Sequence, residues 1–285
     1  MPAIALRRKL SPLQLSLPVT SRRITVALAG LLVVVTVLVL LAPLLAPYDP
    51  VQPVGDLDLP PLSPHHLLGT DAVGRDLLSR TLLGMRASWL SALAVVAVGL
   101  LFGGIIGVVA GAAGGWIDGL LMRLTDLFLA LPSALVAIAI VSALGPGLVH
   151  TLIGISVVWW PYYARILRAE VRGLAIRPHV EAARLAGVGR FRIVAFHILP
   201  GAIPTAMVTA SLDIGNVVLL LSGLSFLGLG RPEPAPELGA DVAAALDQLI
   251  TQWWVPIIPG LAVLLLSLVA NIGGDALRRL VGDRR

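Results

Sequence analysis

Long apolar runs alternate with short polar connections along this chain. Six of the runs reach or approach the roughly 20 residues that a helix needs to cross the hydrocarbon core of a bilayer. They cover residues 24–45, 89–113, 120–143, 148–164, 203–229 and 254–276. Because lipid offers no hydrogen-bond partner, each run must satisfy its backbone groups internally, as a helix does. The pattern predicts an all-α integral membrane protein with six transmembrane helices.

The polar segments between the runs divide the chain into five predicted regions. An interfacial helix is expected where charged residues mix with leucines at helical spacing across 68–83; it either leads into the second span or contacts a partner outside the membrane. Pro161 predicts a kink in the fourth span. The regions are a basic N-terminus (1–23), a first transmembrane helix (24–45), a proline-rich outer connector with the interfacial helix (46–88), a core of five transmembrane helices (89–276) and a C-terminus (277–285).

The basic residues predict which side of the membrane each segment occupies. If the N-terminus is cytoplasmic, most of the 21 lysines and arginines lie on the inner side, as the positive-inside rule requires. The exceptions are Arg75, Arg80, Arg86 and Arg231. We therefore expect both termini in the cytoplasm. The net charge of +5 reflects this sidedness and calls for no nucleic-acid partner.

The composition excludes several kinds of chemistry. The chain is 57% hydrophobic and 13% charged, and it has no cysteine, which rules out disulfides, thiolate metal sites and cysteine nucleophiles. Its one lysine, Lys9, precedes Leu10, so the chain lacks the Gly-Lys-Ser/Thr of a phosphate-binding loop and cannot hydrolyse ATP through that motif. It also lacks HExxH, which argues against an intramembrane enzyme. We predict no catalytic residue, no metal site and no cofactor bound by this chain.

A polar segment at residues 165–202, between the fourth and fifth runs, has an ordered pattern of its own. Pro178 suits the first turn of a helix, where its missing N–H costs nothing. Glu181 lies in the same turn, which is favourable at the positive end of the helix dipole. The pattern predicts a short helix over 178–186 that ends at Gly187.

A second segment over 190–199 is predicted to end at Pro200 and to lead into the fifth span. Together the two segments form a helix–turn–helix on the cytoplasmic side. It either docks another protein or lies on anionic lipid through its arginines. The fixed spacing of its motifs favours docking.

Two features inside the spans invite an interpretation. Glycines recur at every fourth position of the second span, which predicts close packing against a neighbouring helix at Gly99, Gly103, Gly107 and Gly111. Asp213 lies deep in the fifth span, with Asn216 one turn on. A charge at that depth usually faces a pore or a partner helix. Asp213 therefore lies at the translocation path or a subunit interface, or it makes a hydrogen bond to another helix of this subunit.

Four ordered blocks give the chain a family resemblance. It resembles the C-type permease subunit of the dipeptide, oligopeptide and nickel family of ABC importers, over most of its length. His197 together with Leu199-Pro200 is also typical of the C-type permeases of this family. The blocks are Gly69-Thr70-Asp71 with Gly74-Arg75-Asp76, Glu181-Ala182-Ala183 with Gly187, the run from Leu224 to Gly230, and Gly274-Asp275 with Leu277-Arg278.

The resemblance implies the permease fold of a type I ABC importer in a bacterial inner membrane. It makes 165–202 the EAA loop that couples the permease to its ATPase. The coupling residues would be Glu181, Ala182, Ala183, Arg184, Gly187, Arg190, His197, Leu199 and Pro200. The outer-face motif would be Gly69, Thr70, Asp71, Gly74, Arg75 and Asp76.

The resemblance also implies partners and a substrate class. The partners are a second homologous permease in a heterodimer, two ABC ATPases that use ATP and Mg²⁺, an extracytoplasmic substrate-binding protein and membrane lipid. Peptides are the expected substrate, and nickel or another small solute is the alternative. An ion-coupled secondary transporter is a further alternative, which the scarcity of intramembrane acids disfavours.

Overall fold

A computed structural model describes residues 22–282, so the basic N-terminus and the last three residues lie outside the described part of the chain. Within it, all regular elements are helical, and two isolated β-bridges fall in the outer connector. The helices are α1 (Arg22–Leu40), α2 (Ala42–Leu45), α3 (Leu77–Ala113), α4 (Gly115–Leu129), α5 (Ser133–Leu144), α6 (Leu148–Ala175), α7 (Pro178–Leu185), α8 (Arg190–Ile193), a π-helical turn (Val194–Ile198), α9 (Leu199–Phe226), α10 (Leu238–Ala244), a 3₁₀ turn (Leu246–Gln248) and α11 (Trp254–Gly282). The all-α prediction is confirmed.

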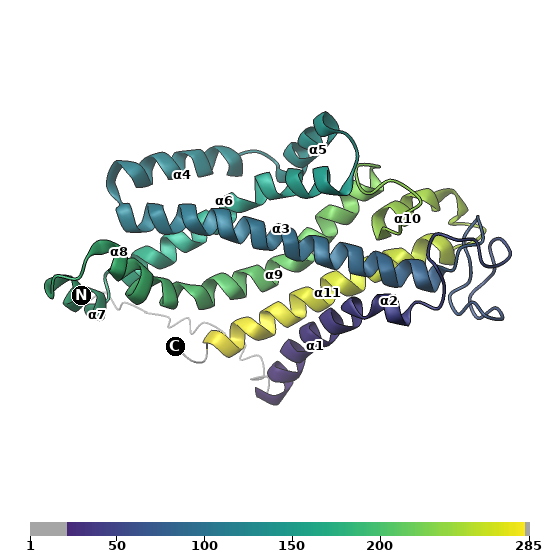
Figure 1. The fold of residues 1–285 in the computed structure, drawn as a ribbon, viewed down its shortest axis with the longest axis horizontal. Helices are drawn as coiled ribbons and strands as arrows, with labels where there is room; N and C mark the ends of the chain where they lie inside the picture. The colour runs from purple at the N-terminus through teal and green to yellow at the C-terminus, as the bar shows by residue number, and fades with distance from the viewer. Residues whose placement is uncertain (1–21, 283–285) are drawn as a thin grey trace, which may run out of the picture.

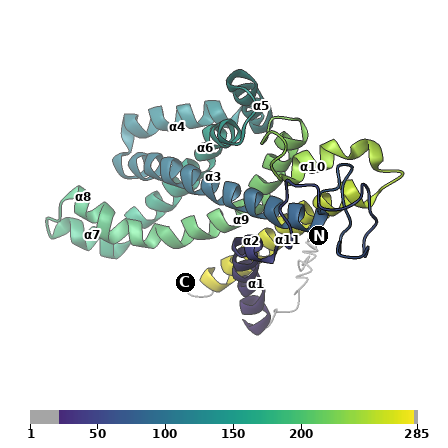
Figure 2. The ribbon, with the colours of Figure 1, turned by 45° about the vertical axis from the view of Figure 1, so that its right-hand side comes forward.

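The long helices α3, α6, α9 and α11 run along the long axis of the molecule and pack against one another (Figure 1). Helix α1 lies beside α11, and α4 and α5 lie on the other side of α6. The short helices α7 and α8 form one end of the molecule, whereas α10 and the connector 46–76 form the opposite end (Figures 1 and 2). The core helices therefore separate two ends of different construction.

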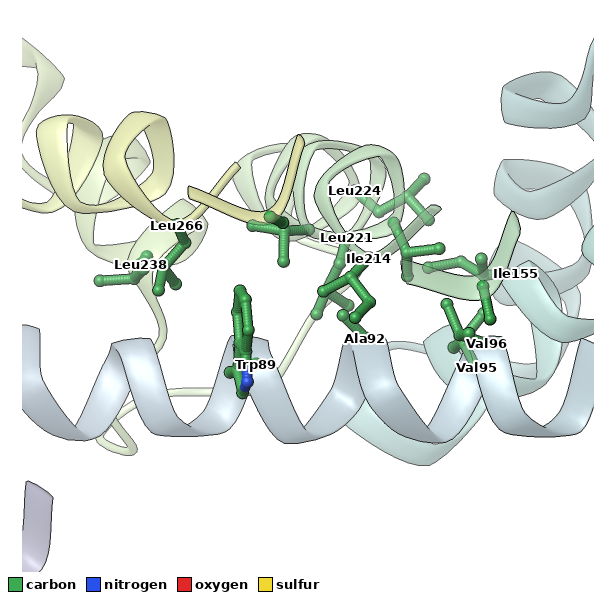
Figure 3. Packing of buried hydrophobic residues seen from close by; sticks show 14 of the residues in the cluster. Trp89, Ala92, Val95, Val96, Ile155, Ile214, Leu221, Leu224, Leu238 and Leu266 are labelled. Carbon is green, nitrogen blue, oxygen red and sulfur yellow. The ribbon is translucent and has the colours of Figure 1, made fainter. Parts of the chain in front are cut away.

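Side chains from four long helices meet in the centre. Trp89 is fully buried and lies between α3 and the outer ends of α9 and α11, near Leu221 and Leu266 (Figure 3). Ile155 of α6 joins the same cluster. Outward-facing positions of the same helices carry large apolar side chains, such as Leu101 and Leu264, that are more than half exposed. A surface of this kind suits lipid rather than water.

Length and apolar character mark four helical segments as able to cross a membrane: α1, α3, α11 and the continuous path of 190–226 that includes α9. Helices α4 and α5 together could make a fifth, but they meet at an angle of 83°. Helix α6 falls outside this set, because arginines and a glutamate occupy its second half. The count of six spans stays a prediction.

The prediction of one unbroken helix over 120–143 is wrong. The break follows from Pro132, because a proline disfavours helical geometry in the residue before it and cannot donate a backbone hydrogen bond. The last turn of α4 closes instead with a hydrogen bond from the N–H of Leu131 to the carbonyl of Phe128, three residues back, at 3.3 Å. Helix α5 starts afresh at Ser133.

The predicted interfacial helix is also different in the structure. Residues 69–76 form turns, and the helix begins at Leu77, where the Asp76 carboxylate accepts the backbone N–H of Ser79 at 2.8 Å as an N-cap. From Leu77 the helix continues without a break to Ala113. The segment leads into the second span, and contact with a partner outside the membrane stays a prediction. Pro161 lies within α6, whose helix continues through it.

The α3 glycines lie against α6. A Cβ at Gly103 would come within 2.1 Å of the Trp160 carbonyl oxygen, and one at Gly107 within 2.4 Å of the Ala164 carbonyl oxygen. Added side chains at Gly99 and Gly111 would meet Tyr163 and Val171. The backbones of α3 and α6 thus approach at a distance that only glycine permits.

Candidate functional site

The loop between α6 and α9 forms a protruding tip (residues 176–198), which we call the inner tip after the cytoplasmic side on which the sequence predicts it. Pro178 occupies the first turn of α7, and Val180 is fully buried. Val180 packs in a small core with Ile193 and Ile198 from the other arm of the tip and with Leu174 of α6. One side of α7 is thereby fixed to the membrane helices, and its other side is left open.

Gly187 ends α7, at the residue where the sequence predicts the turn. Its φ of +78° lies in the left-handed region that glycine favours. The N–H groups of Gly187 and Val188 donate to the carbonyls of Arg184 and Ala183, both at 3.1 Å, and close the helix end. A Cβ at Gly187 would meet no atom within 4 Å, so the turn faces open space.

Large apolar side chains are exposed on the inner tip. Phe191 is 86% exposed and Leu185 is 84% exposed, and Ile176 and Phe196 are exposed to a similar degree. Ile176 and Leu185 lie outside the segments able to cross a membrane, whereas Phe191 and Phe196 lie at the start of the 190–226 path, so lipid burial does not account for all of these residues. Exposed apolar groups outside the spans are typical of protein–protein or membrane interaction sites.

The predicted coupling residues surround this apolar patch. Among the described residues, neither Glu181 nor its arginine neighbours at 184 and 190 make an ion pair. His197 is half-buried, and its Nδ1 has no hydrogen-bond partner within residues 22–282. Ala183 is half-buried, whereas the rest of the set is exposed: Glu181, Ala182, Arg184, Gly187, Arg190, Leu199 and Pro200.

The second arm of the tip does not end at Pro200, contrary to the sequence prediction. Helix α8, the π turn and α9 form one continuous helical path from Arg190 to Phe226. In the π turn the N–H of Leu199 bonds to the carbonyl of Val194, five residues back. We attribute the continuity to this wider turn, which gives room for a proline ring that would clash with an ordinary helical turn.

An ion cluster braces the inner ends of α4 and α6. The buried Asp118 carboxylate accepts a hydrogen bond from Arg168 Nη2 at 2.8 Å and others from Arg168 Nε and Arg172 Nη2. The two arginines are one turn apart on α6, which leads directly into α7. The sequence contained one sign of this cluster, an acid in the short inner connection opposite regularly spaced arginines.

The opposite end of the molecule, which we call the outer cap, consists of the connector 46–76, the start of α3 and the loop 230–253. Here several charged residues, among them Asp71, Asp76 and Arg80, are buried and paired, whereas others such as Asp49 and Glu233 are exposed. The Asp76 carboxylate caps α3 and also contacts His66 Nδ1 at 2.9 Å. Asp71 accepts the Arg75 Nε–H at 2.6 Å and the backbone N–H groups of Val73 and Arg75.

Thr70 and two glycines complete the fold of the connector. Thr70 Oγ1 donates to the Asp56 carbonyl at 2.6 Å. Gly69 and Gly74 have φ near +80°, and added Cβ atoms would lie 2.1 Å and 2.4 Å from the carbonyl oxygens of Leu59 and Gly55. The predicted outer-face residues thus contact one another and the connector within this chain.

Arg80 joins three distant segments of the outer cap. Its Nη1 donates to the carbonyls of Pro50 at 2.9 Å and Pro234 at 3.2 Å, and its Nη2 pairs with Asp241 of α10. Nearby, the buried Glu237 accepts hydrogen bonds from the Ser225 hydroxyl and the Arg231 N–H. Burial raises the pKa of both Glu237 and Asp241, and these bonds partly offset it.

Asp213 connects two helices of this subunit. It is 5% exposed, and its carboxylate accepts the Trp159 Nε1–H of α6 at 3.2 Å. The structure therefore contains the hydrogen bond within the subunit, which was one of the two alternatives. Asn216 is exposed on α9. Within residues 22–282, no three His, Asp or Glu side chains come together as metal ligands.

Comparisons with known proteins agree on one family. Residues 103–285 match the model of the family described as binding-protein-dependent transport system inner membrane component. The chain is 43% identical over 260 residues to the di/tripeptide transport system permease protein of Pseudomonas aeruginosa (strain UCBPP-PA14), covering 88% of this chain and 86% of the relative. It is 37% identical to the probable D,D-dipeptide transport system permease protein of Escherichia coli (strain K12), covering 92% and 88%. It is also 39% identical to the nickel transport system permease protein of the same organism, covering 81% and 84%.

Proposed function

This chain belongs to the family of binding-protein-dependent transport system inner membrane components, and we propose that it is the permease subunit of an ATP-driven peptide importer. The chain is a multi-pass membrane protein, with the inner tip and both termini on the cytoplasmic side. It pairs with a second, homologous permease. Two ATPase subunits, which use ATP and Mg²⁺, bind from the cytoplasm, and an extracytoplasmic binding protein delivers the substrate.

The observation that carries this proposal is the exposed apolar patch on the inner tip. Leu185 and Phe191 are almost fully exposed, while Val180 fixes the same short helix to the membrane helices. A site built in this way offers apolar anchors to a partner and transmits the partner's movement to α6 and α9. The ATPase is the expected partner, because the tip coincides with the predicted coupling residues.

The two connections of α7 suggest how ATP binding drives transport. Helix α6 enters the tip and the continuous path of 190–226 leaves it, so a displaced α7 moves both helices. ATP favours one of two arrangements of the permease pair by stabilising the matching position of the docked tips. The ATP-hydrolysing chemistry belongs to the ATPases, and this chain contributes the passage and the coupling.

Peptides are the proposed substrate. The proteins named above with higher coverage are permeases of di/tripeptide and D,D-dipeptide systems. Nickel is the second candidate substrate, because the chain also matches a nickel permease, with somewhat lower coverage. Sequence similarity of this degree assigns the transport architecture more firmly than the transported molecule.

Co-purification from native membranes in mild detergent tests the proposal. We expect a second permease and one or two ATPases with phosphate-binding loops to be retained with this chain. Gly187→Arg should reach the membrane and lose the ATPases, because it places a long, charged side chain on the docking surface. A chain recovered alone and monodisperse, or a Gly187→Arg variant that retains its ATPases, would contradict the proposal.

Reconstitution tests the substrate. The complete complex with its binding protein should transport a radiolabelled dipeptide only when ATP is present on the side of the vesicle membrane that carries the ATPases. Uptake of ⁶³Ni²⁺ measured in parallel decides between the two candidates. Uptake by this chain alone without ATP would support an ion-coupled transporter instead.

A further inference from the structure

A second polar surface lies on α4 and α6, next to the ion cluster of Asp118. Asp126 of α4 and Arg165 of α6 form an ion pair, with their side chains 60% and 55% exposed. Asp126 falls inside the third apolar run, eight residues beyond Asp118, which corresponds to about 12 Å along α4.

Lipid does not account for this ion pair. Charged side chains that face hydrocarbon are costly, and in membrane proteins they turn toward water or toward protein. Helix α3 covers the opposite side of α6, where Gly103 and Gly107 meet its backbone. Arg165 is the first residue of the segment that the sequence predicts to be cytoplasmic, so the face of α6 that bears it meets water or another subunit.

A cavity opens on the same face of α6, one turn from Arg165. It has a volume of about 370 Å³ and lies between α6, α9 and α11, toward their inner-tip ends. Tyr162, Thr205, Thr209 and Arg278 supply its polar lining. Tyr162 and Arg165 are three residues apart on one helix and are therefore neighbours on its surface.

The chemistry of the cavity distinguishes a passage from a packed interface. Hydroxyl groups and one guanidinium surround an open volume within the range of small-molecule sites. Arg278 is exposed and, in the described part of the chain, makes no ion pair. The Thr209 hydroxyl donates to the Thr205 carbonyl at 2.9 Å, whereas the Arg278 guanidinium beside the Tyr162 side chain is suited to a carboxylate.

We propose that this cavity is the inner part of the translocation path and that Arg278 holds the terminal carboxylate of a peptide in transit. The proposal rests on the proposed function, since it assumes that the substrate is a peptide. Tyr162 contributes a hydroxyl group, and the Asp126–Arg165 pair keeps the adjoining wall polar. The site is a brief stop that prevents the peptide from facing a purely apolar passage.

Thiol labelling tests where the cavity opens. Because the chain has no cysteine, Thr209→Cys introduces a single reactive group into it. The complete complex in proteoliposomes is treated with two methanethiosulfonates of similar size, one carrying a sulfonate and one a trimethylammonium. We expect labelling of this chain, with the anionic reagent favoured, and about a tenfold loss of that preference when Arg278→Gln is added. Arg123→Gln, an exposed arginine on α4, is the matched control and should leave the preference unchanged.

The outcomes separate the possible environments. Labelling of the isolated chain but not of the complex would place the cavity at the interface with the second permease and overturn the proposal. Absence of labelling in both, with labelling of an accessible control position at the inner tip, would place it against lipid. An unchanged reagent preference in Arg278→Gln would remove the carboxylate site.

Transport gives an independent readout. Dipeptide uptake by Arg278→Gln should fall about tenfold, while stimulation of ATP hydrolysis by the binding protein is retained. This combination separates a defective path from a defective complex. Full uptake by Arg278→Gln would overturn the proposal and leave the proposed function intact, whereas loss of both activities in the unaltered complex would refute the proposed function itself.

Discussion

At the outer cap, the charged side chains of Asp71, Asp76 and Arg80 are buried and find their partners within this chain. At the inner tip, Leu185 and Phe191 are large, apolar and exposed. Both ends carry family motifs in the sequence, yet one motif is satisfied internally and the other is open. We infer that the motif whose groups are paired within the subunit maintains the fold, and we expect a partner to cover the apolar side chains beside the open one.

Removal of Arg80 should have the largest effect. Arg80→Leu leaves the buried Asp241 without its cation and breaks two bonds to backbone carbonyls, which should destabilise the chain by about 3–5 kcal/mol. Thermal unfolding followed by size-exclusion chromatography in detergent measures the loss. Arg190→Leu at the inner tip is the matched control, and equal loss of stability in both variants would erase the contrast between the two ends.

Phe191→Asp should affect assembly without affecting the fold. The side chain contacts solvent in the isolated subunit, so the unfolding temperature should stay unchanged. If Phe191 is a central anchor for the ATPase, binding should weaken by about 2 kcal/mol, or roughly 30-fold. Titration of the purified ATPase onto the permease pair measures it. Retained affinity would show that docking uses another surface.

Two glycines with the same backbone conformation provide a sharper comparison. Gly69 in the outer cap and Gly187 at the inner tip have φ of +82° and +78°, so alanine brings similar conformational strain to both. Only at Gly69 does the new Cβ clash, 2.1 Å from the Leu59 carbonyl oxygen. Gly69→Ala should therefore lose about 1–3 kcal/mol more stability than Gly187→Ala. Equal losses would mean that the connector is not packed as described.

The smallest effect should come from pH and should be confined to the outer cap. Burial raises the pKa of Glu237 in the folded protein, so folding favours its protonated form. Stability should therefore rise as the pH falls from neutral toward the unfolded pKa of about 4.5, and the gain is lost as the pH increases through the folded pKa. Glu237→Gln should flatten this dependence. A dependence that persists in Glu237→Gln would assign it to Asp241, whose pKa is raised for the same reason.

Much of the fold could be predicted because helices that cross a membrane require long apolar runs, which are visible in the sequence. The short helix α7 was also predictable, since Pro178 and Gly187 mark its ends by local backbone chemistry. The break between α4 and α5 went unrecognised although Pro132 signals it. An apolar run alone does not distinguish one straight helix from two bent ones. The family resemblance is confirmed by relatives that match most of the chain.

The polar pairings were beyond sequence reasoning. Arg80 and Asp241 are 161 residues apart, and Arg165 and Asp126 are 39 residues apart. Neither pair shares an element or a repeat. Their association depends on how α3, α4, α6 and α10 pack against one another, and no local sequence pattern determines that packing. For the same reason, the motif at 69–76 could be recognised without its role in the connector being visible.

The length of α3 has a mechanical consequence. Its 37 residues extend about 55 Å, nearly twice the hydrocarbon thickness of a bilayer. One end packs against α6 close to the inner tip, and the other carries the outer cap. A tilt of about 10° about the inner end would displace the outer cap sideways by roughly 10 Å. If a binding protein rests on the outer cap, a tilt of α3 that follows ATP binding on the opposite side of the membrane would change the angle at which the binding protein is held.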